Sequence, residues 1–276
     1  MKELIRFAAH LEMNFGPGVP FHDRWRAARR SGFRGCEFVW RNVELPAAAE
    51  LQKAEPLAVS CLGGTTGAAA GARPVLILPE DRDRLMKDVE TATAYARELS
   101  CRNLVMVSGN MIRDWSVEKH REEAVRSLRS IAPILEEAGV TALIEPLNSK
   151  IDHKGVYCDT SAEGFRIVEQ TGSPNVKLLY DAYHMQVMGE PIVRTIRERS
   201  GLIGYYHLAK VPGRTEPIGG EIDVPAFLEA VADTGYDGFV GLEYKPSGDY
   251  RDVFRRLSDA YPEQIDGQDP IDENYR

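Results

Sequence analysis

The chain has 276 residues, of which 43% are hydrophobic and 28% are charged, and this is the composition of a globular protein. Its 34 basic and 42 acidic residues give a net charge of −8, and no run of lysine and arginine is long enough to follow a phosphate backbone, so we expect no nucleic-acid partner. No apolar run approaches the length of a membrane span, so we expect no membrane partner either.

The N-terminal residues and the cysteines indicate where the protein resides. The sequence MKELIRFAAHLEM lacks the apolar segment and small-residue cleavage site of an export signal, so we expect a cytoplasmic protein. Four widely spaced cysteines without a CxxC pair predict reduced, mostly buried thiols rather than a disulfide framework.

Short apolar runs alternate with longer amphipathic stretches along the chain. The candidate strands are residues 7–13, 35–40, 57–64, 103–109, 141–148, 176–184, 202–209 and 238–244. The clearest helical segments are 79–100 and 116–139, and the second has a capping residue at each end, Ser116 and Gly139. Strands of this kind, each followed by a helix, form a parallel sheet covered by helices, and eight units favour closure. The pattern predicts one α/β domain, a (β/α)8 TIM barrel, over residues 1–261.

Several segments outside the regular pattern are unusual. The Gly/Ala-rich segment 65–78 lacks the GxxxxGK[ST] pattern of a phosphate-binding loop, so we expect a mobile lid or a plain loop. Segments 149–159 and 210–223 are long polar or Pro/Gly-containing loops. Residues 262–276 contain little apolar material, and we expect a flexible polar tail or a docking arm.

The last four predicted strands each have, toward their carboxyl end, a residue that can bind a metal: Glu145, Asp181, His207 and Glu243. The functional groups of a TIM barrel lie at the ends of its strands. A lone carboxylate inside an apolar strand has a large desolvation cost and requires a partner, which one divalent metal ion would supply. Three carboxylates and one imidazole suit Mg²⁺ or Mn²⁺ better than zinc. Each residue taken alone could instead be a helix cap or a salt-bridge partner.

Four strings resemble those of a known family: EPLNSKID (145–152), LLYDAYHMQ (178–186), AKVPGRTEP (209–217) and GLEYKP (241–246). They are similar to the hydroxypyruvate isomerases and, more broadly, to the xylose-isomerase-like TIM barrels that include ketose 3-epimerases. The resemblance extends from about residue 4 to residue 260. It implies a metal-dependent proton shift beside a carbonyl through an enediolate, without an organic cofactor, on a small hydroxy-carbonyl or sugar-acid substrate.

The resemblance also implies roles for individual residues. Glu145 and Glu243 would be both metal ligands and acid/base groups, and we expect them to approach opposite faces of the substrate. His184 would donate a hydrogen bond to the reacting oxygen, and Arg214 would bind a substrate oxygen or carboxylate. Lys245, beside Glu243, is a weaker candidate for substrate binding.

The chain departs from each subfamily. Hydroxypyruvate isomerases tend to have Gln where this chain has His207, whereas epimerases have His. Ketose 3-epimerases usually have a further Glu where this chain has Ile151. An isomerase of the hydroxypyruvate isomerase type is the leading hypothesis, and a ketose 3-epimerase is the nearest alternative.

Other classes of protein remain as alternatives. A lyase or deglycosidase could use the same proton abstraction to expel a β-substituent. A non-catalytic binding barrel would lack metal binding. The related apurinic endonucleases need a histidine cluster and a basic face, which this sequence lacks. The chain could form a homo-oligomer, although no segment identifies the contact.

Overall fold

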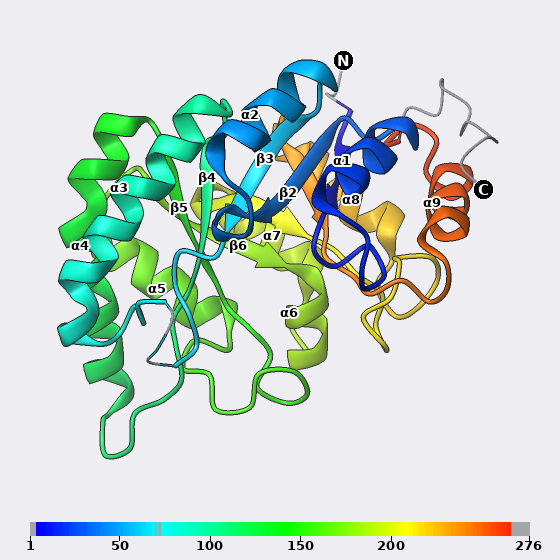
Figure 1. Cartoon of the computed structure of the whole chain (residues 1–276). Coiled ribbons are helices and arrows are strands. Elements are labelled where there is room, and N and C mark those ends of the chain that lie inside the picture. Colours follow the sequence, from blue (N-terminus) through cyan, green and yellow to red (C-terminus); the bar gives the residue numbers. More distant parts are fainter. Residues whose placement is uncertain (1–3, 70, 72, 266–276) are drawn as a thin grey trace.

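The computed structural model describes residues 4–69, 71 and 73–265, and its strands form one closed barrel (Figure 1). In barrel order the strands are β1 (Arg6–His10), β2 (Gly35–Val39), β3 (Ala58–Gly63), β4 (Asn103–Val107), β5 (Thr141–Glu145), β6 (Val176–Asp181), β7 (Ile203–His207) and β8 (Phe239–Leu242). Neighbouring strands are parallel, and β1 pairs with both β2 and β8, which closes the ring. The predicted (β/α)8 TIM barrel is confirmed.

Helices cover the outside of the barrel (Figure 1). The α-helices are α1 (Phe21–Arg30), α2 (Leu45–Ala54), α3 (Arg82–Glu98), α4 (Val117–Ala138), α5 (Ser161–Thr171), α6 (Ala182–Met188), α7 (Ile192–Arg199), α8 (Val224–Asp233) and α9 (Tyr250–Ala260). Short 3-10 turns are η1 (Trp40–Asn42), η2 (Pro79–Asp81) and η3 (Ser200–Leu202). Because helices cover the outer face of the sheet, both faces of its strands are buried, and this explains their nearly continuous apolar sequences.

The caps of α4 lie where the sequence predicted them. The Ser116 side chain accepts a hydrogen bond from the Lys119 N–H at 3.1 Å, and Gly139 ends the helix with a φ of 65°. Glycine adopts this left-handed conformation without the steric cost that a Cβ would add. The predicted helix 79–100 consists of the 3-10 turn η2 followed by α3.

A layer of buried side chains fills the barrel directly before the strand ends. This layer consists of Cys61, Leu143, Leu179 and Tyr205. Successive side chains of a strand point to opposite faces, so the residue two positions after each of the last three also points into the barrel. Those residues are Glu145, Asp181 and His207. The strand period therefore directs these three candidate ligands into one space above an apolar floor.

The segment 65–78 is held against the barrel in its described part. The Gly67 N–H donates to the Pro74 carbonyl at 2.9 Å, which closes the segment on itself. Residues 75–77 are buried in the core, and the Val75 N–H donates to Asp81 at 2.8 Å. The prediction of a mobile lid or plain loop missed this anchoring, because the apolar residues at the end of the segment pack into the barrel.

The predicted tail, residues 262–276, is described only as far as Ile265. The Ile265 side chain is fully buried, and the Gln264 carbonyl accepts a hydrogen bond from the Phe7 N–H at 3.2 Å. The barrel domain therefore extends past residue 261, because one apolar side chain packs into the core there. The rest of the predicted tail lies outside the described residues.

The cysteines match the prediction of reduced, buried thiols. All four are free and buried. Burial raises the pKa of the Cys158 thiol well above its usual value, which keeps the group protonated. No helix in the described part of the chain combines the length and apolarity that crossing a bilayer requires.

Candidate active site

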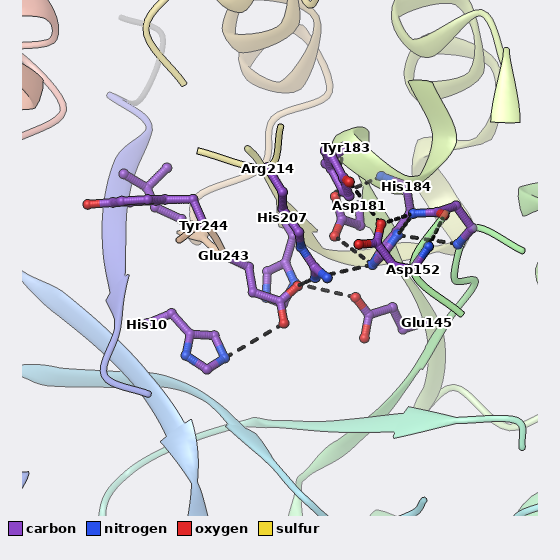
Figure 2. A network of polar contacts seen from close by, with 12 residues as sticks. His10, Glu145, Asp152, Asp181, Tyr183, His184, His207, Arg214, Glu243 and Tyr244 are labelled. Carbon is purple, nitrogen blue, oxygen red and sulfur yellow. Dashed lines mark hydrogen bonds and ion pairs between the residues drawn. The ribbon is translucent and has the colours of Figure 1, made fainter. Parts of the chain in front are cut away.

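The four predicted metal ligands meet at the carboxyl ends of the last four strands (Figure 2). Glu145, Asp181 and His207 end β5, β6 and β7, and Glu243 follows the last residue of β8. One candidate ligand atom from each of the four lies within 4.8 Å of the others. His207 Nδ1 is 3.6 Å from Glu145 Oε1 and 3.5 Å from Glu243 Oε2. The structure thus brings together residues spread over almost 100 positions of sequence.

Three of these atoms are buried without a hydrogen-bond partner. They are Glu145 Oε1, Asp181 Oδ2 and His207 Nδ1. A buried polar atom left unpaired costs about 1–3 kcal/mol, and a charged one costs more. A divalent cation among them would satisfy all three, since carboxylate oxygen and imidazole nitrogen are ligands that Mg²⁺ and Mn²⁺ accept. The four side chains therefore fit the metal site that the sequence predicted.

Asp181 uses its two carboxylate oxygens for different purposes. Oδ1 accepts hydrogen bonds from the Tyr183 N–H at 2.7 Å and the His184 N–H at 3.3 Å, which caps helix α6, while Oδ2 remains unpaired. The predicted strand 176–184 therefore ends at Asp181, because its side chain starts a helix there. Burial and then the Glu243 carboxylate raise the pKa of Asp181 to about 7, and a nearby cation would favour its ionised form.

His207 is bound on its other side by Glu37, a residue that the sequence analysis missed. Glu37 Oε2 lies 3.0 Å from His207 Nε2, and the Glu37 residue is 3% exposed. Burial alone lowers the pKa of a histidine, but Glu37 and the two site glutamates raise the pKa of His207 well above its usual value. A carboxylate on Nε2 fixes the ring so that Nδ1 faces the other ligands.

The barrel makes room for Glu37 at a glycine. A Cβ at Gly241, on β8, would lie 2.5 Å from Glu37 Oε1. The signal for Glu37 was present in GCEFVW, where a carboxylate interrupts an apolar strand as Glu145 does. Its partner is 170 positions away, so sequence spacing alone does not pair it with His207.

Two cationic or imidazole side chains are directed at Glu243 (Figure 2). Arg214 Nη2 donates to Glu243 Oε2 at 2.7 Å, and His10 Nε2 lies 3.8 Å from Oε1. Burial alone raises a carboxyl pKa, but Arg214 and then His207 lower the pKa of Glu243 well below its usual range. Glu243 is therefore held as a carboxylate. His10 ends the apolar strand β1 as His207 ends β7, and this position was its signal in the sequence.

The predicted substrate-binding residue His184 is fully buried, and N–H groups face both of its ring nitrogens. Its Nδ1 accepts a hydrogen bond from the Asn148 N–H at 3.2 Å. Burial and then Arg214 lower the pKa of His184 well below its usual value, so the ring is neutral, and Arg214 Nη2 lies 3.3 Å from its Nε2. Nε2 lies 3.6 Å from Asp181 Oδ2. Nε2 therefore faces both the candidate ligands and the Arg214 guanidinium.

The other predicted substrate-binding residues have different surroundings. Arg214 forms an ion pair with Glu243, and its guanidinium lies over the Tyr183 ring, 5.1 Å from the centroid. The Lys245 side chain is exposed, and its backbone N–H donates to the Arg214 carbonyl at 2.8 Å. Lys245 thus contacts the Arg214 loop through its backbone.

A cavity of about 230 Å³ opens at the candidate site. Glu145, His207 and Glu243 line it together with His10 and apolar residues of β4. Pockets for drug-sized ligands usually have volumes of about 300–1,000 Å³. The cavity therefore suits a small substrate.

Residues 25–261 match the model of the xylose isomerase-like TIM barrel family. The chain belongs to this family. It is 31% identical to hydroxypyruvate isomerase of Escherichia coli over 88% of this chain and 94% of that protein. It is also 31% identical to 2-oxo-tetronate isomerase of Cupriavidus necator, over 87% of this chain and 93% of that protein. With relatives of this kind along nearly its whole length, the chain is an isomerase.

Solved structures agree with the fold. A crystal structure named AP endonuclease, family 2, from Brucella melitensis has a TM-score of 0.85 and 29% identity, and the match covers 93% of this chain and 99% of that one. An L-ribulose 3-epimerase has a TM-score of 0.78 and 18% identity, with 96% and 95% covered. The second likeness shows the fold alone.

Proposed function

We propose that this protein is a metal-dependent isomerase of a short hydroxy-keto acid, and that it interconverts hydroxypyruvate, or a close relative, with the corresponding hydroxy-aldehyde acid. The observation that supports this proposal best is the convergence of four ligand atoms within 4.8 Å at one small cavity. The names of the two isomerase relatives support an acid as substrate.

The proposed metal is one divalent ion, Mg²⁺ or Mn²⁺, held by the four residues that meet at the strand ends: Glu145, Asp181, His207 and Glu243. When bound, such an ion would withdraw charge from the carbonyl and hydroxyl oxygens of the substrate and acidify the adjacent C–H. The proposal includes no organic cofactor, because a proton shift needs none.

The two glutamates would move the proton. In hydroxypyruvate, one carboxylate takes a proton from C3, which leaves an enediolate, and a proton is returned to C2 from the other glutamate. The hydroxyl proton passes from the C3 oxygen to the C2 oxygen, so the product is an isomer with no group gained or lost. Arg214 suits Glu243 to the first role, since the ion pair keeps this carboxyl ionised. Glu145 would serve as the second group.

His184 would stabilise the developing charge on the substrate. With the Asn148 N–H on Nδ1, the ring would carry its proton on Nε2, and Arg214, whose Nη2 lies 3.3 Å from Nε2, would turn its N–H groups to the substrate. Because the ring is neutral and buried, it donates a hydrogen bond without giving up its proton. Arg214 remains a candidate for contact with a substrate oxygen beside its pair with Glu243.

A ketose 3-epimerase is the second candidate, because His207 belongs to the ligand set. An epimerase removes and returns the proton at the same carbon, so it would need both glutamates but a longer substrate. Ile151, where such enzymes usually have a glutamate, is 62% exposed, which weakens this candidate. A lyase would release a leaving group after the same abstraction.

Proton exchange in D₂O, followed by NMR with Mg²⁺, tests the reaction. We expect deuterium at the carbon beside the carbonyl of hydroxypyruvate, and no signal after chelation with EDTA. Exchange with ketoses but not with hydroxypyruvate would favour the epimerase. Release of a β-substituent without isomer formation would favour the lyase.

A further inference from the structure

The cavity contains one cation that neither the metal site nor the acid/base pair uses. Arg73, in the segment 65–78, lines the same cavity as Glu145, His207 and Glu243. It is the only lysine or arginine among the described residues that form the lining. Its side chain is half-buried, and among the described residues it forms no ion pair with a carboxylate. A guanidinium in this position is available to a ligand.

The chain holds Arg73 in place from both sides. The Gly67 N–H donates to the Pro74 carbonyl, directly after Arg73, and residues 75–77 are buried beyond it. The guanidinium passes close to the end of β3, where a Cβ at Gly64 would lie 3.8 Å from Arg73 Cζ. A Cβ at Gly67 would lie 3.3 Å from Arg73 Cβ. The two glycines therefore leave space for an arginine that reaches into the cavity.

The position of Arg73 on the barrel is complementary to the carboxylates. In the closed order of eight strands, three strands separate β3 from β7 in either direction, so these strands lie on opposite walls. Arg73 follows β3, whereas His207 ends β7 and the two glutamates end or follow strands on either side of it. An anionic group would be repelled by the glutamates and attracted to the opposite wall.

Arg214 and Lys245, which the sequence predicted to bind the substrate, do not occupy the position of Arg73. Arg214 is paired with Glu243 at 2.7 Å, and the Lys245 side chain is exposed. Neither is among the residues that line the cavity in the described chain. Of the three cationic side chains, only Arg73 therefore lines the cavity that would hold a substrate carboxylate.

We infer that Arg73 binds the carboxylate of the substrate and so selects acids over neutral sugars, with the reacting carbons between it and the glutamates. This inference rests on the proposed function and specifies its substrate class. Arginine suits the role because its planar fork matches the two oxygens of a carboxylate.

A matched pair of substrates tests the inference. Dihydroxyacetone has the same reacting carbons as hydroxypyruvate, with a hydroxymethyl group in place of the carboxylate. With Mg²⁺ present, we expect Arg73→Gln to lower kcat/KM for hydroxypyruvate by about 10- to 150-fold, the value of a charged hydrogen bond. Turnover of dihydroxyacetone, low in the native protein, should not fall. Arg73→Lys should recover part of the loss, because it keeps the charge without the fork.

Binding of unreactive ligands separates this inference from the proposed function. Calorimetry with glycerate and glycerol, a matched acid and neutral compound, needs no turnover. We expect Arg73→Gln to weaken glycerate binding without affecting Mn²⁺ affinity. Arg102→Gln, an exposed arginine before β4 at the opposite end of the barrel, is the matched control for loss of one charge.

The outcomes are distinct. If the native protein turns over no acid but binds glycerate through Arg73, the proposed function fails and the inference holds. If the native protein isomerises hydroxypyruvate and Arg73→Gln does so equally well, or if the variant loses both substrates equally, the inference is wrong.

Discussion

Glu37 Oε2 lies 3.0 Å from His207 Nε2, on the side of the imidazole opposite the nitrogen that faces Glu145 and Glu243. The pair joins β2 to β7 across the inside of the barrel. Since Glu37 approaches only the nitrogen turned away from the cluster, it orients the ring without occupying a ligand position.

We expect Glu37→Gln to weaken Mn²⁺ binding by about 10- to 100-fold, because the carboxylate that orients His207 is lost. Isothermal titration with Mn²⁺ measures this change. The free energy of unfolding of the metal-free chain should fall as well, since removing one partner of a buried pair leaves His207 without its compensating charge. A variant with native Mn²⁺ affinity would show that Glu37 does not position the ligand.

Gly241→Ala tests the same arrangement from the opposite strand. The new Cβ would lie 2.5 Å from Glu37 Oε1, so Glu37 must move and His207 with it. We expect a loss of Mn²⁺ affinity comparable to that of Glu37→Gln. Gly248→Ala is the matched control, because a Cβ there would meet nothing within 4 Å. Equal Mn²⁺ affinity in the two variants would contradict the steric argument.

Local sequence patterns predicted the strands, and the four-residue cluster followed because each of its members lies at the end of a strand. Each ligand ends an apolar run. The carboxyl ends of the strands of a barrel lie at one face of it, whatever the conformations of the connecting loops. Glu37 produced the same signal, but nothing local pairs it with His207.

Contacts between side chains far apart in the sequence could not be predicted from local patterns. The pattern could not show that Arg214 would pair with Glu243 or that the Lys245 side chain would point to solvent. Arg73 was overlooked for a similar reason: its Gly/Ala-rich segment has no periodicity, and its position depends on the packing of residues 75–77.

Glu145→Gln and Glu243→Gln should each lower the rate of proton exchange by about 10²- to 10⁴-fold, the usual contribution of an acid/base group. Stopped-flow or NMR exchange at saturating Mg²⁺ measures the chemical step, and Mn²⁺ titration shows how much ligand affinity is lost with it. Full activity in either variant would rule out the two-glutamate mechanism.

Addition of Mn²⁺ should stabilise the protein, because the ion binds the folded state and satisfies three unpaired atoms. At an ion concentration of 100 times Kd, the expected gain is about 2.7 kcal/mol. Urea unfolding with Mn²⁺ and with EDTA measures it. Asp181→Ala should abolish the gain. If the urea midpoint of the native protein does not change when Mn²⁺ is added, the protein does not bind this metal, and a binding barrel without metal would be favoured.

A pH-dependent contribution to stability comes from Glu163, on helix α5 and outside the cluster. Burial by itself raises the pKa of Glu163, but two hydrogen bonds from Arg121, at 2.7 and 2.9 Å, lower the pKa below its usual value. A lowered pKa means that the stabilisation is present above the unfolded-state pKa of about 4.3 and is lost as the pH falls below it.

We therefore expect Glu163→Gln to lower the free energy of unfolding by about 2 kcal/mol at pH 7, with a smaller difference from the native chain below about pH 4. Urea unfolding of the metal-free proteins between pH 3 and pH 7 measures the difference. A difference that stays constant over this range would contradict the ion-pair explanation.

The two oxygens of Asp181 link local folding to the assembly of the site. One oxygen sets where helix α6 begins, and the other faces the cluster, so the same χ angles decide both. The backbone cannot start α6 in another register without withdrawing an oxygen from the cluster. The position of the candidate metal-ligand oxygen of Asp181 therefore depends on the first turn of helix α6 forming in the correct register.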